Sequence, residues 1–318
     1  MAIRFDNRVA IVTGAGNGLG RSHALALAAR GAKVVVNDLG GARDGSGASS
    51  DAAQSVVKEI TDNGGEAIAN GANVADFEQV EAMVEQTLDT WGRVDILINN
   101  AGILRDKSFA KMSIEDFRLV MDVHLMGAAN CCKAVWQSMQ DAQYGRILMT
   151  TSSSGMYGNF GQSNYGAAKM AQVGLMNTLA IEGAKYNIRV NALSPIAGTR
   201  MTEELIPEKY INLLTPESVT AAALLLCHED APNRAILCSG AGVYTQSSMY
   251  ETDGVFLPEE LRTPEQVQKH WQQIVDPTGH QALETGAKQT EKFITKAVVE
   301  AMPGVKKLAA KAALYFKK

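Results

Sequence analysis

The sequence of 318 residues predicts a doubly wound α/β fold, in which a parallel sheet carries helices on both faces and a helical extension follows at the C-terminus. Three observations predict it. Short runs of β-branched residues alternate with longer helical patterns, as in βαβ units. Runs such as residues 9–12 and 34–36 are continuously apolar, as expected for strands buried on both faces. After about Val243 the alternation stops, and we expect only helices to follow.

The alternation predicts seven strands and several long helices before residue 245. The strands are expected at residues 8–13, 33–38, 66–70, 94–99, 146–151, 188–193 and 234–239. The clearest helices are expected at residues 19–30, 77–90 and 164–185. We therefore expect one domain over residues 1–245 and a helical extension over residues 246–318 that covers the mouth of a site or a subunit interface. Inside the extension, Thr263-Pro264-Glu265-Gln266 is a capping box that begins a helix.

Composition excludes several classes of protein. With 30 Lys and Arg against 34 Asp and Glu, the net charge of −4 offers no attraction to nucleic acid or to an anionic membrane. The four Cys are too few for a disulfide scaffold, and no Cys/His spacing resembles a zinc site, so we expect core thiols and no metal. The N-terminus lacks the pattern of a secretion signal, and no apolar run is long enough to span a bilayer. The last residues differ from the peroxisomal Ser-Lys-Leu signal, so the cytoplasm is the expected compartment.

A glycine-rich turn joins the first expected strand to the first expected helix. It reads Thr13-Gly14-Ala15-Gly16-Asn17-Gly18-Leu19-Gly20. Glycines at such a turn let the backbone approach a pyrophosphate, and the helix N-terminus adds N–H donors and partial positive charge. A turn of this kind between strand and helix, with an acid downstream, predicts dinucleotide binding by Gly14, Gly16, Asn17, Gly18 and Leu19.

Asp38 is that acid, and it ends the second expected strand just before Leu39. A carboxylate there can accept the ribose hydroxyls of an adenosine and repels a 2′-phosphate, which predicts NAD rather than NADP. Arg43 complicates this prediction, because it lies on the Gly/Ser-rich loop of residues 39–51, expected to be flexible, and could meet a phosphate. The alternative is that Asp38 only caps a turn.

Two further strand ends should flank the cofactor. Asn73 and Val74 follow the third strand, where the adenine would lie. Asn100, Ala101 and Gly102 follow the fourth strand, where small residues allow close backbone approach.

Ser152, Tyr165 and Lys169 are the expected chemical group. Tyr165 and Lys169 are one helical turn apart and share a face, and Ser152 ends the strand that feeds their helix. Oxidation of an alcohol needs a base, and an ordinary Tyr with a pKa of about 10 becomes one near pH 7 only after about 4 kcal/mol of anion stabilisation. A Lys ammonium at about 4 Å supplies on the order of 4 kcal/mol in a largely dry site, so we expect Lys169 to lower the pKa of Tyr165. Ser152 would hold the substrate oxygen against Tyr165. The alternative is an ordinary surface Tyr–Lys pair.

These residues together resemble the short-chain dehydrogenase/reductase superfamily. The similar motifs are the Thr13–Gly20 turn, Asn99-Asn100-Ala101-Gly102, Ser152, Tyr165-x-x-x-Lys169 and Asn191 to Pro195. The resemblance covers roughly residues 5–245 and implies a Rossmann sheet of seven strands, a Tyr general base assisted by Lys, and a homodimer or homotetramer.

A closer resemblance is to the (3R)-hydroxyacyl-CoA dehydrogenase units of the peroxisomal multifunctional enzymes of type 2. The similar stretches are Val36-Asn37-Asp38-Leu39-Gly40-Gly41, residues 155–162 and residues 197–202. This implies NAD-dependent oxidation of a (3R)-hydroxyacyl-CoA to a 3-oxoacyl-CoA. Alternatives with the same chemistry are a hydroxysteroid or other secondary-alcohol dehydrogenase, and a 3-oxoacyl carrier-protein reductase, although Asp38 disfavours the NADPH of the latter. The alternative from another class is an NAD-sensing binding protein.

The chain departs from the wider superfamily in three places. His124 stands where most members carry Asn, so a proton relay would run through its imidazole or a neighbouring backbone carbonyl, unless His124 only lines the core. Ile196 replaces the usual Gly after Pro195, and Ile196, Thr199 and Met201 are the expected contacts to the nicotinamide end. The usual Thr position reads Arg200, so Thr199 or Thr202 would take its place. The chain ends at residue 318, which leads us to expect a stand-alone dehydrogenase. Its Lys-rich end would meet acyl-CoA phosphates or a membrane, or would be a solvated helix.

Overall fold

A computed structural model of the chain describes residues 2–198 and 212–301. The chain divides into two compact units, Met1–Ser247 and Ser248–Lys318. Each unit is described by itself below.

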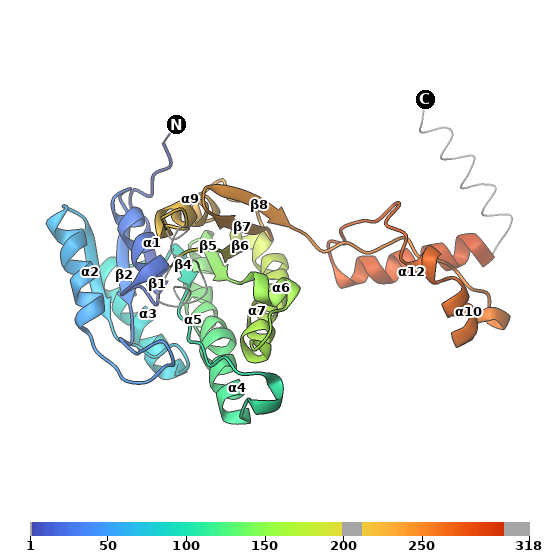
Figure 1. The fold of residues 1–318 in the computed structure, drawn as a ribbon. Helices are drawn as coiled ribbons and strands as arrows, with labels where there is room; N and C mark the ends of the chain where they lie inside the picture. The colour runs from blue at the N-terminus through green and yellow to red at the C-terminus, as the bar shows by residue number, and fades with distance from the viewer. Residues whose placement is uncertain (1, 199–211, 302–318) are drawn as a thin grey trace. The chain divides into compact units, whose positions relative to one another are not determined.

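Eight strands of the described residues form one sheet in the first unit, in the order β3-β2-β1-β4-β5-β6-β7-β8 (Figure 1). The first seven are parallel. Their order reverses beside β1, and at such a point the loops after the strands diverge and leave room for a ligand. The strands are β1 Val9–Thr13, β2 Lys33–Asn37, β3 Glu66–Asn70, β4 Ile96–Asn99, β5 Gly145–Thr150, β6 Ile188–Pro195, β7 Ile236–Gly240 and β8 Val243–Ser247.

The eighth strand corrects the expectation of a seven-stranded, wholly parallel sheet with only helices after Val243. β8 pairs antiparallel with β7 from Gly240↔Val243 to Ile236↔Ser247. The two residues between the strands, Ala241 and Gly242, have φ of 51° and 76°, the left-handed values that a tight hairpin requires. β8 carries mostly exposed side chains, so it has no apolar run by which to recognise it as a strand.

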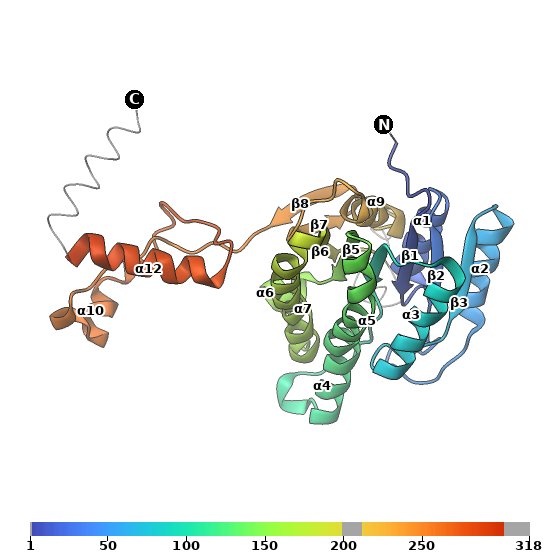
Figure 2. The same ribbon diagram turned by 180° about the vertical axis from the view of Figure 1, so that it is seen from behind.

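Two layers of helices cover the sheet (Figures 1 and 2). One apolar cluster joins β-strand residues to α1, α2 and α9, and a second joins the other face to α3, α5 and α7. Among the described residues of this unit, the helices are α1 Gly18–Ala28, α2 Asp51–Asp62, α3 Phe77–Trp91, η1 Phe109–Lys111, α4 Ile114–Met121, η2 Asp122–Met126, α5 Gly127–Asp141, α6 Ser153–Tyr157, α7 Ser163–Gly183, η3 Ala184–Tyr186 and α9 Pro216–Cys227.

Local sequence sets several helix ends, and one irregular turn lies inside a longer helix. The Asp76 side chain accepts the Gln79 N–H at the start of α3, and Gly92 ends that helix with φ of 74°. The Ser113 hydroxyl accepts the Asp116 N–H and begins α4. Between α4 and α5 the chain makes a π turn, η2, in which the Gly127 N–H reaches the Asp122 carbonyl.

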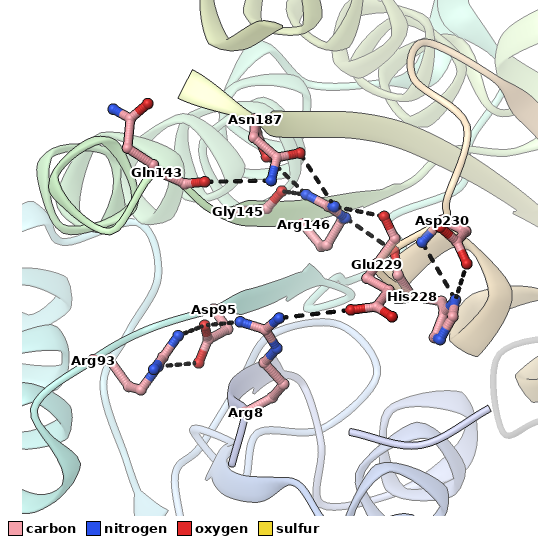
Figure 3. Close-up of polar contacts among 10 residues, drawn as sticks. All are labelled: Arg8, Arg93, Asp95, Gln143, Gly145, Arg146, Asn187, His228, Glu229 and Asp230. Atoms are coloured by element: carbon pink, nitrogen blue, oxygen red, sulfur yellow. Dashed lines mark hydrogen bonds and ion pairs between the residues drawn. The ribbon is translucent and has the colours of Figure 1, made fainter. Parts of the chain in front are cut away.

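A cluster of charged groups closes the amino edge of the sheet, away from the strand ends expected to bind ligands. Arg8 and Arg93 both direct their guanidinium groups at Asp95, which is fully buried (Figure 3). The buried Arg146, at the start of β5, donates to the main-chain carbonyls of His228, Glu229 and Asn187 at 2.9, 2.7 and 2.7 Å (Figure 3). The carbonyls of His228 and Glu229 lie just after α9, so Arg146 supplies hydrogen-bond donors at the C-terminal end of that helix. Its bond to Asn187 also joins β5 to the segment before β6.

The second unit holds η5 Glu259–Leu261, α10 Pro264–Lys269, α11 Trp271–Ile274 and α12 Gly286–Ala301. Thr263 accepts the Gln266 N–H at 3.4 Å, so the predicted helix start is confirmed. The reciprocal half of the capping box is not formed, because the Thr263 N–H donates to the Leu261 carbonyl at 2.9 Å. The expected helix is shorter than its apolar spacing suggested, because it breaks at His270, and Val267 and Trp271 stay 42% and 54% exposed. Lys292 of α12 is paired with Glu251 at 2.9 Å. Among the described residues, no helix has the length and apolarity needed to cross a membrane.

Candidate active site

The loops after β1, β2, β3 and β4 enclose a cavity of about 340 Å³ in the first unit. Most of the residues expected to bind the cofactor line it. They are Gly14, Asn17, Gly18, Leu19, Asp38, Leu39, Asn73, Val74, Asn100, Ala101 and Gly102.

The glycine turn leaves no room for side chains. A Cβ on Gly14 would lie 2.8 Å from the Ala101 Cα, and a Cβ on Gly20 would overlap the Gly14 carbonyl oxygen. Gly14 also has φ of 64°, which L side chains rarely adopt. The N-terminus of α1 therefore points its N–H groups at a cavity that the backbone itself lines, which fits a pyrophosphate.

Asp38 is held in place by two backbone donors. Its Oδ2 accepts the Gly16 N–H at 2.7 Å, and its Oδ1 accepts the Gly40 N–H at 2.7 Å. A carboxylate has about four acceptor positions, so each oxygen retains one for a ribose hydroxyl. Gly16 is not among the residues that line the cavity, and its part is to orient Asp38.

Asn100 joins the fourth strand end to the glycine turn. Its Nδ2 donates to the carbonyls of Thr13 and Gly14, both at 3.0 Å, and its own N–H reaches the Thr13 hydroxyl at 3.0 Å. The side chain thus holds the two cavity walls together, which the sequence interpretation did not foresee.

The loop after Asp38 contributes more to the cavity than its composition suggested. It is folded on itself by a bond from the Ser49 N–H to the Leu39 carbonyl, at 3.0 Å, and tied to the opposite wall by the Leu104 N–H on the Arg43 carbonyl, at 3.0 Å. The sequence analysis missed cavity residues in this loop and on the side of α4. The glycines after Asp38 were the only sequence signal for the loop residues. The missed residues include Gly41, Ala42, Gly45, Ile103, Leu119 and Val123.

Ser152, Tyr165 and Lys169 come together at the carboxyl ends of β5 and β6. The Ser152 Oγ accepts the Ser154 N–H at 3.2 Å as the N-cap of α6, and the Ser152 side chain lies beside the Tyr165 hydroxyl. Lys169 is 2% exposed, and its Nζ lies 5.5 Å from the centre of the Tyr165 ring. The same Nζ donates to the Thr150 carbonyl at 2.5 Å.

In the protein alone, burial raises the pKa of Tyr165, the Ser152 side chain opposes that rise, and the charge of Asp106 adds to it. The expectation that Lys169 lowers this pKa stays a prediction for the complex with the cofactor, whose positive charge would add to that of Lys169. Burial also lowers the pKa of Lys169 to about 7, so the ammonium is itself only partly charged at neutral pH. The ammonium donates to the Thr150 carbonyl, and desolvation is the largest influence on the phenol.

His124 lies inside the protein beside this group. It is 1% exposed, and its ring meets the Tyr165 ring edge-on with 5.2 Å between centres. Its Nε2 lies 2.8 Å from the Ile103 carbonyl oxygen and 3.1 Å from the Ile103 nitrogen. Burial, with Lys169 nearby, places the pKa of His124 well below its ordinary value of 6.5, so the imidazole is neutral.

Of the three residues expected to contact the nicotinamide end, only Ile196 is described, and it does not line the cavity. Ile196 is 52% exposed and its N–H is bonded to the Ser239 carbonyl at 2.8 Å. Thr199 and Met201 lie outside the described residues.

The sheet is doubly wound, and its cavity lies over a glycine turn and an acid at the end of β2. With a Ser–Tyr–Lys group beside that cavity, these features define a dinucleotide-dependent dehydrogenase. The family model described as short chain dehydrogenase matches residues 8–209, and the chain belongs to this family.

The chain is also similar to individual members. It is 50% identical over 277 residues to peroxisomal multifunctional enzyme type 2 of Mus musculus, covering 86% of this chain and 37% of that protein. It is 47% identical over 275 residues to a short-chain type dehydrogenase/reductase of Mycobacterium tuberculosis, covering 86% of this chain and 96% of that protein. The chain thus spans little more than a third of the mouse relative.

Two solved structures share the fold. Full-length peroxisomal multifunctional enzyme type 2 of Drosophila melanogaster superposes with a TM-score of 0.77 at 39% identity, covering 93% of this chain and 50% of that one. A 7α-hydroxysteroid dehydrogenase complexed with NADH and 7-oxo glycochenodeoxycholic acid superposes with a TM-score of 0.68 at 30% identity, covering 77% of this chain and 96% of that one.

Proposed function

We propose that this protein is an NAD-dependent dehydrogenase that oxidises a (3R)-hydroxyacyl-CoA to the 3-oxoacyl-CoA. The observation that carries the proposal is the group of Ser152, Tyr165 and Lys169, in which a buried ammonium lies one helical turn from a phenol that has a serine hydroxyl beside it. The choice of substrate is supported by the 50% identity to the mouse multifunctional enzyme. The choice of NAD is supported by the position of Asp38 and by the similar hydroxysteroid dehydrogenase complexed with NADH.

Each residue of the group has a separate task in this reaction. When bound, NAD would supply the acceptor for the hydride of the carbinol carbon, and its positive charge before the transfer would favour the ionised form of Tyr165. Tyr165 accepts the hydroxyl proton of the substrate, so that the C–O bond becomes a carbonyl and one proton is released for each alcohol oxidised. We propose that the Ser152 hydroxyl turns its proton from Tyr165 to the substrate oxygen and holds that oxygen at Tyr165, while the Ser152 Oγ still accepts the Ser154 N–H.

Lys169 and His124 support the base. We propose that Lys169, with a pKa of about 7, passes on the proton that Tyr165 takes up, because it can exist in both protonation states near neutral pH. His124 is neutral and contacts the Tyr165 ring, so we propose it as the next group along this route.

The test is turnover of NAD by the whole chain, read as NADH absorbance. (3R)-hydroxyacyl-CoAs of several acyl lengths should be oxidised, and their (3S) isomers should not. Tyr165→Phe, which keeps the ring but removes the hydroxyl, should lose at least about 100-fold in kcat while NADH still binds. Turnover by Tyr165→Phe at the wild-type rate, or NADH binding without turnover of any alcohol, would refute the proposal and leave a nucleotide-sensing protein.

A hydroxysteroid is the second candidate substrate, because the similar hydroxysteroid dehydrogenase covers 77% of this chain. Bile acids and other hydroxysteroids should therefore be tested as substrates in the same assay. Reduction of a 3-oxoacyl carrier protein with NADPH should be tested in the reverse direction. Higher kcat/KM for a steroid than for every hydroxyacyl-CoA would replace the proposed substrate but not the proposed chemistry.

We also propose a homodimer or homotetramer in the cytoplasm. The assembly is supported by β8, an edge strand on which Val243 and Tyr244 stay 62% and 48% exposed. Light scattering of the purified protein measures the number of subunits. Imaging of the tagged protein tests the compartment, and the names of the relatives make the peroxisome the competing outcome.

A further inference from the structure

Gln172 makes an unusual contact across the core of the first unit. It lies on α7, three residues after Lys169 and therefore on the same face of the helix. Its Nε2 donates to the main-chain carbonyl of His124 at 2.7 Å, and this carbonyl lies within the π turn η2. The side chain thus joins the helix that carries Tyr165 and Lys169 to the irregular turn that carries His124.

Stability alone does not explain an amide at this position. Gln172 is 1% exposed, and its Oε1 has no hydrogen-bond partner among the described residues. Burial of an amide costs free energy that one hydrogen bond offsets only in part, and an apolar side chain would avoid this cost. The neighbouring buried positions of α7, Val173 and Met176, are apolar and belong to the core. A polar residue kept at such a cost indicates a task other than holding the fold together.

The group that Gln172 holds is in contact with the reacting residue. The His124 ring stands edge-on to the Tyr165 ring, with 5.2 Å between centres. On its other side it fills the space beside Gly102, where a Cβ would overlap the ring, and its Nε2 lies against the Ile103 backbone. A displacement of the His124 turn would therefore move both the Tyr165 ring and the Gly102–Ile103 wall of the cavity.

We propose that Gln172 is a positioning residue of the dehydrogenase site, whose amide fixes the His124 carbonyl in the π turn and thereby sets the imidazole against Tyr165. The inference rests on the proposed function. It concerns the placement of the base, because Gln172 acts through His124 and does not line the cofactor cavity. Misplacement of a reacting group by about 1 Å lowers rates by about 100-fold, so this one hydrogen bond has a large expected effect on kcat.

The test compares Gln172→Met with Val173→Ala, the adjacent core position. Met retains the length and volume of Gln without its amide, so the variant removes the contact and the unpartnered oxygen together. Val173→Ala removes core volume but leaves the contact intact, and it controls for loss of stability. We expect kcat of Gln172→Met to fall about 10-fold to 100-fold, with KM and the NADH dissociation constant within about threefold of wild type. Val173→Ala should unfold at lower temperature and retain kcat.

A second measurement needs no substrate. The ionisation of Tyr165 is read as the difference in phenolate absorbance between each protein and the same protein with Tyr165→Phe. The apparent pKa of Tyr165 should move by about one unit in Gln172→Met and stay in place in Val173→Ala. If Gln172→Met fails to fold, Gln172→Asn keeps the amide but is one methylene too short for the contact, and the same changes are expected.

The outcomes separate the two proposals. Absence of turnover by the wild-type chain with every alcohol refutes the proposed function, whatever the variants do. Wild-type turnover with kcat and Tyr165 ionisation unchanged in Gln172→Met refutes the role of Gln172 alone. Equal losses of kcat in Gln172→Met and Val173→Ala also refute it, because they would show a general effect of core disruption.

Discussion

The Lys169 ammonium lies 2.5 Å from the main-chain carbonyl oxygen of Thr150, the last residue of β5. This bond ties the catalytic face of α7 to the strand that leads to Ser152. It also gives the ammonium a neutral partner in a buried place, which is why burial dominates and lowers the pKa of Lys169 to about 7. Lys169 therefore lowers the stability of the folded protein and is also part of the site.

Lys169→Met should make the protein more stable and inactive. An unfolded Lys has a pKa of 10.5 and the folded one about 7, so between these values the unfolded chain binds more protons. Stability of the wild type therefore rises with pH across this window, and at pH 7 and below it carries a penalty on the order of 5 kcal/mol. Loss of the bond to Thr150 costs about 1–3 kcal/mol in the variant, which leaves a net gain of roughly 2–4 kcal/mol at pH 7.

Denaturant unfolding at pH 7 and pH 10 measures this gain. Lys169→Met should exceed wild type at pH 7, and the difference should shrink towards pH 10. A variant that is less stable than wild type at both pH values would show that the ammonium stabilises the fold. Lys185→Met is the matched control, because Lys185 is exposed and its replacement should leave stability unchanged at both pH values.

Asp38→Asn should weaken the discrimination between NAD and NADP. A 2′-phosphate placed about 4 Å from the carboxylate is repelled by on the order of 4 kcal/mol for each charge at an effective dielectric of 20. Asn removes the charge but keeps one oxygen for the Gly16 or Gly40 N–H, so the loop changes less than in Asp38→Ala. We expect the NADP-to-NAD ratio of kcat/KM to rise by about 100-fold, measured with the same alcohol. An unchanged ratio would mean that Asp38 only shapes the turn.

Local sequence patterns predicted the parts of the site that depend on local structure. The glycine turn, Asp38 and the Ser152–Tyr165–Lys169 group each follow a strand end or a helical repeat. The parallel order of the strands brings the first two to one cavity and places the third at the same edge of the sheet. The hairpin strand β8 was missed because its side chains are exposed and only Ala241-Gly242 signals the turn. The π turn and its Gln172 contact could not be predicted, because both depend on packing between segments far apart in the sequence. The rise in the pKa of Tyr165 that burial causes in the protein alone could not be predicted, because residue spacing does not show how deeply the phenol is buried.

Arg146→Met should lower stability without changing the reaction. The side chain is 1% exposed and donates to the carbonyls of His228, Glu229, Asn187 and Gly145 (Figure 3). Met fills much of the volume but leaves these acceptors without their donor, so we expect a loss of about 3–5 kcal/mol in the free energy of unfolding. Arg146 lies at the amino end of β5 and Ser152 follows its carboxyl end, so kcat should be unchanged at temperatures where the variant is folded. A loss below about 1 kcal/mol would contradict this prediction, and Arg234→Met serves as a less buried control.

His23 should make the protein sensitive to acid. It is fully buried between α1 and α9, its Nδ1 lies 2.8 Å from the Thr220 hydroxyl, and burial lowers its pKa from 6.5 to about 4. Between pH 6.5 and pH 4 the unfolded chain binds the proton and the folded chain does not, so stability falls as the pH falls through this window. The full contribution is about 3 kcal/mol, complete below pH 4. His23→Gln has no titrating group there and can still bond to Thr220, so its stability should fall less than that of wild type between pH 7 and pH 4.5. Urea unfolding at a series of pH values measures both curves, and parallel curves for the two proteins would show that His23 does not contribute to acid unfolding.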